Sequence, residues 1–246
     1  MAEPNLAVIA ALSLAVSGAA TLVAAFVGVP LGTFLASREF RGQRFLRAFL
    51  HALYGLPPVL LGLVLFLALS KSGPMGSLSL LFTVPGMVLA QFLLVLPFVT
   101  ALTMSAVLEL DPAVRDTART LGAEGRAFIL TLIREARPGV LSAVMVGFGR
   151  AISEVGAVQM VGGNIRGDTQ VLTTSIMEFT QAGQFGVAVG LGFTVGWLIV
   201  RTYIVDRGVN YTQALAMRPP SVGRSGFEAT THYETRGGRH GTLVKV

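Results

Sequence analysis

The most regular feature of the chain is a series of long apolar stretches without a charged residue. The charge-free intervals run from Glu3 to Arg38, Arg47 to Lys71, Lys71 to Glu109, and Glu178 to Arg201. A helix needs about 20 predominantly apolar residues to cross a bilayer, so each interval can hold a span. A further apolar stretch is interrupted only by Arg150 and Glu154. The pattern predicts five membrane-spanning helices, within residues 6–36, 48–70, 83–108, 139–161 and 179–200.

The composition supports a membrane protein. Hydrophobic residues make up 52% of the 246 residues and charged residues only 13%, against roughly half and a quarter in soluble domains. This shortage of charge excludes a soluble globular domain. The absence of cysteine excludes a disulfide framework and a thiolate metal site. We therefore predict an all-α, polytopic transmembrane helix bundle.

The basic residues gather in three blocks, each of which follows an apolar stretch. The blocks are Arg38, Arg41, Arg44 and Arg47, then Arg115 to Arg137, then Arg201 to Lys245. Cytoplasmic loops carry an excess of Lys and Arg, so the blocks predict that the N-terminus lies outside and the C-terminus inside. Only Lys71 and Arg166 then remain on the outer side. A nucleic-acid-binding protein would need a basic face on a polar domain, and the sequence has no such domain.

The amino-acid composition of the chain changes at about Met217. From there to Val246 it is rich in Gly, Thr, Arg and His, and its apolar residues show no periodic spacing. Such a composition is typical of disorder. The sequence therefore predicts one membrane domain, residues 1–216, followed by a disordered cytoplasmic tail, residues 217–246.

A short polar segment between the third and fourth spans has clear helix boundaries. Asp111 can accept hydrogen bonds from the free amides of a helix start, and Pro112 suits the first helical position. Gly122 suits the left-handed residue that ends a helix. We therefore expect a short amphipathic helix over residues 112–121. Its apolar face would consist of Val114, Ala118 and Leu121. From these residues alone, a helix resting on the anionic headgroups of membrane lipid explains the segment equally well.

The same segment resembles a known motif. The run from Asp116 to Gly122, Asp-Thr-Ala-Arg-Thr-Leu-Gly, is similar to the Glu-Ala-Ala-x-x-x-Gly loop in permease subunits of ATP-binding-cassette (ABC) importers, with Asp-Thr in place of Glu-Ala. In that family the loop forms a coupling helix that sits in a groove of a cytoplasmic ATPase. The resemblance implies a role in ATPase coupling for Arg115, Asp116, Thr117, Ala118, Arg119 and Gly122.

Two further parts of the chain resemble the permeases of oxyanion importers. Residues 28–32 (Gly-Val-Pro-Leu-Gly), 40–42 (Phe-Arg-Gly) and 56–62 (Leu-Pro-Pro-Val-Leu-Leu-Gly) are similar to the front half of these permeases. Residues 149–157 (Gly-Arg-Ala-Ile-Ser-Glu-Val-Gly-Ala), continuing through 161–165, resemble the tungstate branch. The resemblance implies the transmembrane fold of type I ABC importers, a location in the cytoplasmic (inner) membrane, and the import of an oxyanion. Tungstate is the expected substrate, and molybdate or a sulfate-type anion is the alternative.

The resemblance also implies partners. Five spans cannot easily enclose a path for a hydrated dianion, so we expect a homodimer with the path on its two-fold axis. Two copies of an ATPase would dock on the cytoplasmic face, and one extracytoplasmic oxyanion-binding protein would dock outside. The chain has no Gly-x-x-x-x-Gly-Lys-Ser/Thr phosphate loop, so it should not hydrolyse ATP. It would be a transport subunit and not an enzyme, with ATP and Mg²⁺ bound by the partner ATPase and no cofactor of its own.

The fourth predicted span contains two charged residues. Arg150 and Glu154 are four residues apart and would be neighbours on one helix face. A single charge in hydrocarbon is costly, so such residues normally face a bundle interior or a water-filled cavity. One interpretation is a structural ion pair that holds the span to its neighbours. The other is a polar step of the translocation path, with Ser153 on the adjoining face.

A polar segment follows on the predicted outer side. Asn164, Thr173 and Thr174 are candidates for a mouth that meets the binding protein, and an ordinary polar loop is the alternative. For the whole chain, a gradient-driven carrier or channel without an ATPase is a second hypothesis. It is less well supported, because no internal repeat is visible and an odd number of spans fits inverted halves poorly.

Overall fold

The computed structural model describes residues 6–37 and 41–216, which form helices and short loops without a strand. The all-helical class is therefore confirmed over this part of the chain, and the predicted tail, residues 217–246, lies outside it. The α-helices are α1 (Leu6–Ser37), α2 (Gln43–Ala52), α3 (Pro58–Leu69), α4 (Val84–Leu108), α5 (Pro112–Thr120), α6 (Gly125–Glu135), α7 (Arg137–Ile152), α8 (Gly156–Gly162), α9 (Leu172–Gln181) and α10 (Phe185–Ala216). Short 3₁₀ turns cover Leu53–Gly55 and Gly76–Leu78.

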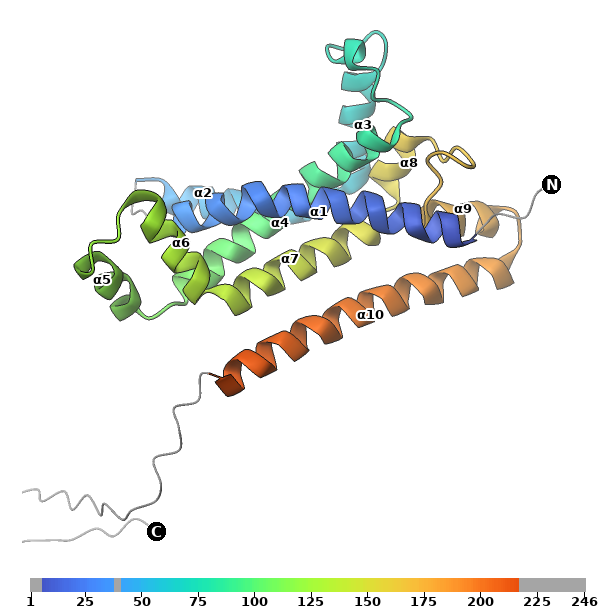
Figure 1. The fold of residues 1–246 in the computed structure, drawn as a ribbon. Helices are drawn as coiled ribbons and strands as arrows, with labels where there is room; N and C mark the ends of the chain where they lie inside the picture. Colours follow the sequence, from blue (N-terminus) through green and yellow to red (C-terminus); the bar gives the residue numbers. More distant parts are fainter. Residues whose placement is uncertain (1–5, 38–40, 217–246) are drawn as a thin grey trace, which may run out of the picture.

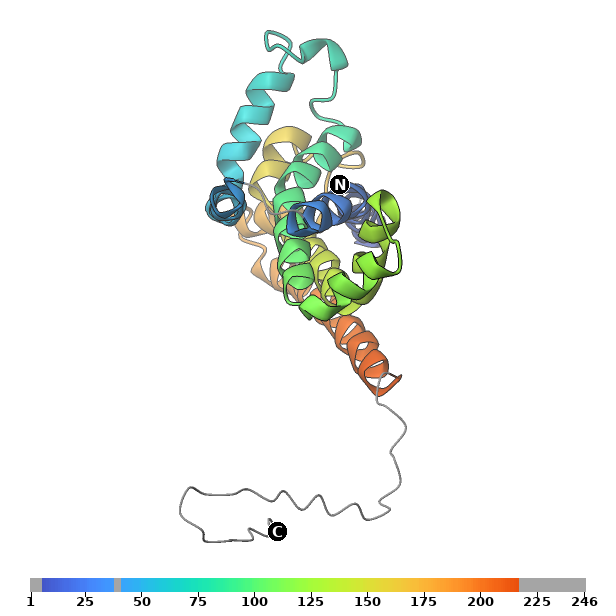
Figure 2. The same cartoon turned by 90° about the vertical axis from the view of Figure 1, so that its left-hand side faces the viewer.

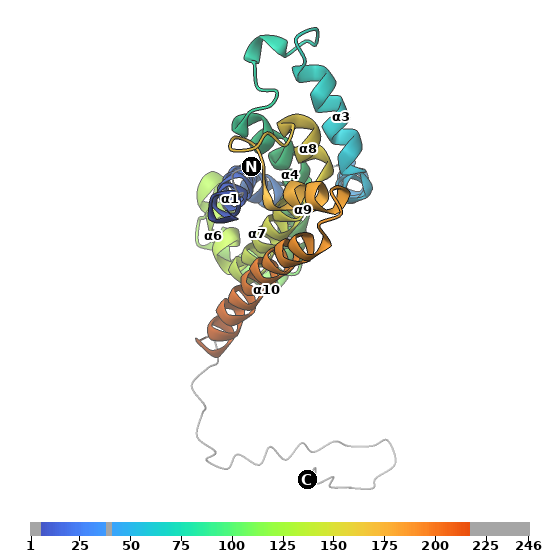
Figure 3. The same cartoon turned by 90° about the vertical axis from the view of Figure 1, so that its right-hand side faces the viewer.

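The long helices α1, α4, α7 and α10 run along the length of the molecule (Figure 1). α1 packs along α4, α7 contacts both of them, and α10 packs on α7 and α9. α3 stands away from this bundle and contacts mainly α8, as the two end-on views show (Figures 2 and 3). α5 and α6 lie at one end of the bundle, and α8, α9 and their connecting loop lie toward the other end.

α1 and α4 approach each other closely because α1 presents glycines to α4. A β-carbon at Gly32 would lie 2.4 Å from the carbonyl oxygen of Thr100, and one at Gly28 would lie 3.0 Å from its Oγ1. Small residues allow helix backbones in membrane proteins to meet in this way. Pro30 and Pro97 lie inside these helices without ending them. Neighbouring helices in a bundle make such prolines tolerable.

Two of the predicted spans have the expected apolar length, or three if a bent pair of helices is counted as one span. α1 and α4 are each long and apolar enough to cross a membrane, and they match the predicted spans 6–36 and 83–108. The predicted span 139–161 is a bent pair, in which α7 and α8 meet at 59°. With this pair counted once, up to three spans satisfy length and composition within the described residues. The five-span topology and the N-out/C-in orientation stay predictions.

The other two predicted spans are not the continuous helices that the sequence led us to expect. Within 48–70 the helix is interrupted before Pro58, where α3 begins, because a proline does not continue a preceding helix. α3 has 12 residues. A helix rises about 1.5 Å per residue, so α3 is too short by itself for a hydrocarbon core of about 30 Å. Within 179–200, a turn at Gly183 (φ 73°) separates α9 from α10.

The outward faces of the helices are strongly apolar. Phe26 of α1, Leu67 of α3 and Phe193 of α10 are 83%, 57% and 75% exposed. Large exposed apolar surfaces mark contact with lipid or with another protein. The outer surface of the bundle is therefore suited to a membrane and to further subunits.

Candidate coupling helix and translocation site

α5 is a short helix with a defined cap at each end. At its start, Asp111 Oδ1 accepts a hydrogen bond of 2.8 Å from the Ala113 N–H, and Pro112 occupies the first turn. At its end, Gly122 has a φ of 78°. The N–H of Ala123 donates to Ala118 at 3.0 Å and the N–H of Gly122 to Arg119 at 2.9 Å, which is a Schellman cap. The predicted helix is confirmed, and it ends at Thr120 rather than at residue 121.

The predicted apolar face of this helix is only partly correct. Ala118 is buried against the neighbouring structure, but Leu121 is 80% exposed. Leu121 follows the last helical residue, so its side chain does not continue the helical face. The structure therefore leaves a large apolar side chain uncovered at the tip of α5.

The two arginines of α5 contact the neighbouring helices. Nη2 of Arg115 donates a hydrogen bond of 2.9 Å to the carbonyl oxygen of Val107, in the last turn of α4. The guanidinium of Arg119 lies 5.4 Å from the centroid of the Phe128 ring in α6, a cation–π arrangement. Asp116 and Thr117 are exposed. The motif thus contains two arginines that hold α5 to the bundle, of which Arg119 is itself exposed, and the exposed residues Asp116 and Thr117, which a partner could reach.

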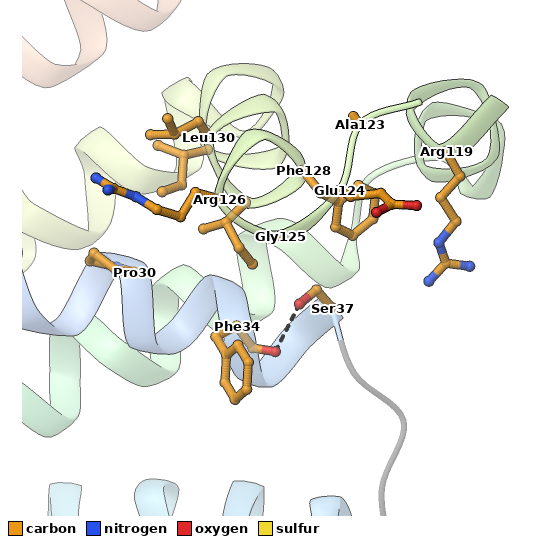
Figure 4. A pocket seen from close by; sticks show the side chains of 12 residues that line it. Pro30, Phe34, Ser37, Arg119, Ala123, Glu124, Gly125, Arg126, Phe128 and Leu130 are labelled. Atoms are coloured by element: carbon orange, nitrogen blue, oxygen red, sulfur yellow. Dashed lines mark hydrogen bonds between the residues drawn. The ribbon is translucent and has the colours of Figure 1, made fainter. Parts of the chain in front are cut away.

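A groove of about 1020 Å³ lies beside α5, between α1 and α6 (Figure 4). α1 contributes Pro30, Phe34 and Ser37, and the hydroxyl of Ser37 donates to the carbonyl of Phe34 at 2.9 Å. Arg119 and Arg126 also line the groove. Arg115 ties α5 to α4 and Arg119 ties it to α6, so these two helices support α5.

The break between α7 and α8 is built around one buried carboxylate. Glu154 is 4% exposed, and its Oε2 accepts a hydrogen bond of 2.7 Å from Nη1 of Arg150. Its Oε1 accepts from the Ala157 N–H at 3.1 Å, and its backbone carbonyl accepts from Thr173 Oγ1 at 2.8 Å. The predicted pair is therefore formed, but not on one helix face, since α7 ends at Ile152. Glu154 joins α7, α8 and α9.

Two other polar side chains lie near this break. Ser153 is exposed, and its hydroxyl donates to the carbonyl of Arg150 at 3.1 Å. Gln91 of α4 is buried, and its Nε2 donates to the carbonyl of Ala151 at 3.0 Å. Its Oε1 has no hydrogen-bond partner among the described residues. Gln91 was not among the residues predicted from the sequence, although it is the single amide side chain within the apolar stretch 83–108.

At the other end of the molecule, Glu178 of α9 accepts hydrogen bonds from polar side chains of the preceding loop. Its Oε2 accepts from Asn164 Nδ2 at 2.9 Å and from Gln170 Nε2 at 2.6 Å, and its Oε1 accepts from Arg166 Nε at 2.9 Å. Asn164 was a candidate predicted from the sequence, whereas Glu178 and Gln170 were not. The one available signal was an acidic residue in a segment whose only nearby cation is Arg166.

The two threonines named for the outer mouth are buried. Thr173 is 7% exposed and Thr174 is 1% exposed. Thr174 Oγ1 accepts from the Val171 N–H at 3.0 Å and so begins α9. Both hydroxyls make hydrogen bonds within the fold. Of the three candidates, only Asn164 lies in the loop itself.

Acid should weaken the Glu178 cluster. Burial raises the pKa of the Glu178 carboxyl, but hydrogen bonds from Arg166 and Asn164, the charge of Arg166 and a hydrogen bond from Gln170 outweigh it and lower the pKa below 4.5. A carboxyl with a lowered pKa stabilises the folded state above its unfolded pKa, and this stabilisation is lost as the pH falls through the folded pKa. We expect acidification from about pH 6 to about pH 3 to lower the melting temperature more in the natural chain than in Glu178→Gln. Equal falls in the two proteins would contradict this.

A helical, membrane-type bundle with a charged break inside one span and a capped, exposed helix at one end has the architecture of the membrane subunit of a transporter. Residues 28–209 match the family of binding-protein-dependent transport system inner membrane components, so the chain belongs to this family. Over 193 residues it is 40% identical to the tungstate uptake system permease protein of Peptoclostridium acidaminophilum, covering 78% of this chain and 85% of the relative.

Two further relatives are similar over comparable lengths. The chain is 39% identical to a probable anion ABC transporter permease protein of Haloferax volcanii, over 75% of this chain and 82% of the relative. It is 29% identical to the molybdenum transport system permease protein of Azotobacter vinelandii, over 83% of this chain and 92% of the relative. In all three cases the similarity covers three quarters of this chain or more.

Proposed function

We propose that the chain is the membrane-spanning permease subunit of an ABC importer for an oxyanion, with tungstate as the substrate. The observation that carries this proposal is α5, a helix capped at both ends, tied to α4 and α6, and exposed at Asp116 and Thr117. A cytoplasmic ATPase would hold this helix and move the bundle between inward-facing and outward-facing states. The similarity to a tungstate uptake permease supports the choice of substrate.

The proposed assembly contains two copies of this chain, two ATPase subunits and one extracytoplasmic binding protein. The large apolar surfaces on the outside of the bundle support contacts with lipid and a second copy. The proposed path lies on the two-fold axis between the copies. ATP and Mg²⁺ would bind to the ATPase, and this chain would need no cofactor of its own.

Arg150 provides the proposed polar step for a dianion. Its side chain is 27% exposed, whereas that of its partner Glu154 is 4% exposed. A guanidinium has five N–H donors. The hydrogen bond to Glu154 uses one nitrogen, Nη1, so other donors stay available. The buried carboxylate therefore fixes the arginine, while the surface that meets the path is cationic, with the Ser153 hydroxyl beside it.

The substrate is tested by uptake into vesicles that contain the chain, its ATPase and its binding protein. Labelled tungstate should enter only when ATP is supplied, and a moderate excess of molybdate or sulfate should compete weakly. Relatives named for molybdenum and sulfate transport make these two anions the alternatives. Stronger competition by either anion would reassign the substrate. Uptake sustained by an ion gradient without an ATPase would overturn the proposal in favour of a carrier.

Substitution of Gly122 by valine should weaken the binding of the ATPase. Gly122 has a φ of 78°, which a β-branched residue rarely adopts, so the end of α5 would unwind. We expect the variant to insert into the membrane and to retain several-fold less ATPase in affinity purification. Gly183→Val is the matched control, because Gly183 has a φ of 73° and equally open surroundings but lies between α9 and α10. Equal retention of the ATPase by both variants would argue against a coupling role for α5.

A further inference from the structure

α5 is held to the bundle by very few side chains. The hydrophobic cluster at this end of the molecule contains Val107 of α4 and Leu132 of α6, and Phe128 packs against it, but no residue of α5 belongs to it. Ala118 is the one buried residue of α5. A helix without a large apolar anchor depends on its polar contacts for its orientation. For α5 those contacts come from its two arginines.

Arg115 makes the contact to α4. Its Nη2 donates at 2.9 Å to the carbonyl oxygen of Val107, which is fully buried in the hydrophobic cluster. Val107 lies in the last turn of α4, and its carbonyl oxygen also accepts a longer hydrogen bond of 3.3 Å from the Leu110 N–H. A guanidinium at a helix C-terminus also interacts favourably with the helix dipole. The arginine thus adds a shorter, charge-assisted hydrogen bond to this carbonyl and joins α5 to the core of the bundle.

Arg119 makes the second contact, to α6. Its guanidinium lies over the Phe128 ring, and that ring packs against the same hydrophobic cluster. The two arginines are four residues apart, so they extend from neighbouring turns of α5. α5 is therefore attached at two points, to the helix before it and to the helix after it. Such a two-point attachment opposes rotation about the three-residue connection from α4 to α5.

We propose that Arg115 is a positioning residue for transport, which transmits the movement of α5 to α4 without contacting the ATPase. This inference rests on the proposed function, because it assumes that an ATPase moves α5. The exposed part of α5, including Asp116 and Thr117, receives the movement. The Arg115 side chain carries it to the C-terminal turn of α4. Without this side chain, α5 would turn on its connection while α4 stayed in place.

The test compares Arg115→Met with Arg115→Lys in vesicles that contain the ATPase and the tungstate-loaded binding protein. Methionine resembles the apolar stem of the arginine side chain but cannot donate a hydrogen bond, whereas lysine keeps a donor and a charge. We expect Arg115→Met to bind the ATPase normally and to retain hydrolysis without substrate. Its tungstate uptake per ATP hydrolysed should fall about tenfold, the effect of losing one charge-assisted hydrogen bond. Arg115→Lys should recover most of the uptake per ATP.

A matched control is Arg134→Met, which removes an exposed arginine from α6 and should leave uptake per ATP unchanged. If Arg115→Met accumulates poorly, the recovery is measured with Arg115→Gln and Arg115→Lys instead, with the same expected order. Unchanged uptake per ATP in the variants without a charge would overturn the inference, and so would loss of ATPase binding, which would make Arg115 a docking residue. If the natural chain binds no ATPase, the proposed function itself fails.

Discussion

Replacement of Glu154 by alanine should abolish uptake and strongly destabilise the protein. The carboxylate accepts hydrogen bonds from Arg150 and from the Ala157 N–H. Its removal leaves a guanidinium without its partner inside the bundle and an amide without an acceptor at the start of α8. Breaking a buried ion pair by removing one partner costs about 3–5 kcal/mol. We therefore expect a large fall in melting temperature in detergent and no measurable uptake in vesicles.

Two further variants separate the charge from the shape of Glu154. Glu154→Gln keeps an oxygen that can accept from Ala157 but loses the negative charge, so its melting temperature should lie between those of the natural chain and Glu154→Ala. Glu135→Ala is the control, because Glu135 is exposed on α6. It should lower the melting temperature by little. If Glu154→Ala melts like the control, the carboxylate does not organise the break.

Replacement of Gly32 by alanine should separate α1 from α4 at the end that carries α5. The added β-carbon would lie 2.4 Å from the carbonyl oxygen of Thr100 and 3.1 Å from the Met104 nitrogen, both backbone atoms that cannot rotate away. The helices must move apart, which costs about 1–3 kcal/mol or more by overpacking. We expect a clearly lower melting temperature and reduced uptake, because the end of the bundle that carries α5 would be displaced.

Gly18→Ala, in the same helix, is the control and should not lower the melting temperature. A β-carbon at Gly18 meets no atom within 4 Å, so the substitution adds no collision. Alanine is favoured over glycine in a helix by about 1 kcal/mol, so the melting temperature should stay the same or rise slightly. Equal losses of stability in Gly18→Ala and Gly32→Ala would show that the close contact between α1 and α4 is not what makes Gly32 necessary.

The sequence allowed α5 to be predicted almost to the residue because its boundaries depend on local chemistry. Asp111, Pro112 and Gly122 act on amides and carbonyls within a few residues of themselves, and these contacts are the ones observed. The directions in which the side chains of Arg115 and Arg119 extend could not be predicted from such local chemistry. It depends on where α4 and α6 lie, which no pattern within α5 contains.

The span around residues 139–161 also combines features that the sequence predicts with features that it does not. Its apolar length and the ion pair between Arg150 and Glu154 were evident from the sequence. The bend was not, because it is maintained by partners distant in the chain, such as Thr173, whose hydroxyl reaches the Glu154 carbonyl. Gln91 was missed for a similar reason, since its contact with Ala151 spans two helices.

The sequence by itself thus determined the helical class, the long apolar helices α1 and α4, and the capped helix α5. These properties follow from hydrophobic transfer and from hydrogen bonds between near neighbours. The tertiary structure alone decided which distant polar groups meet: Glu154 with Thr173 of α9, Glu178 with its loop, and Arg115 with the end of α4. Such contacts depend on the arrangement of helices in space, which is set by the packing of the whole bundle and not by any one segment.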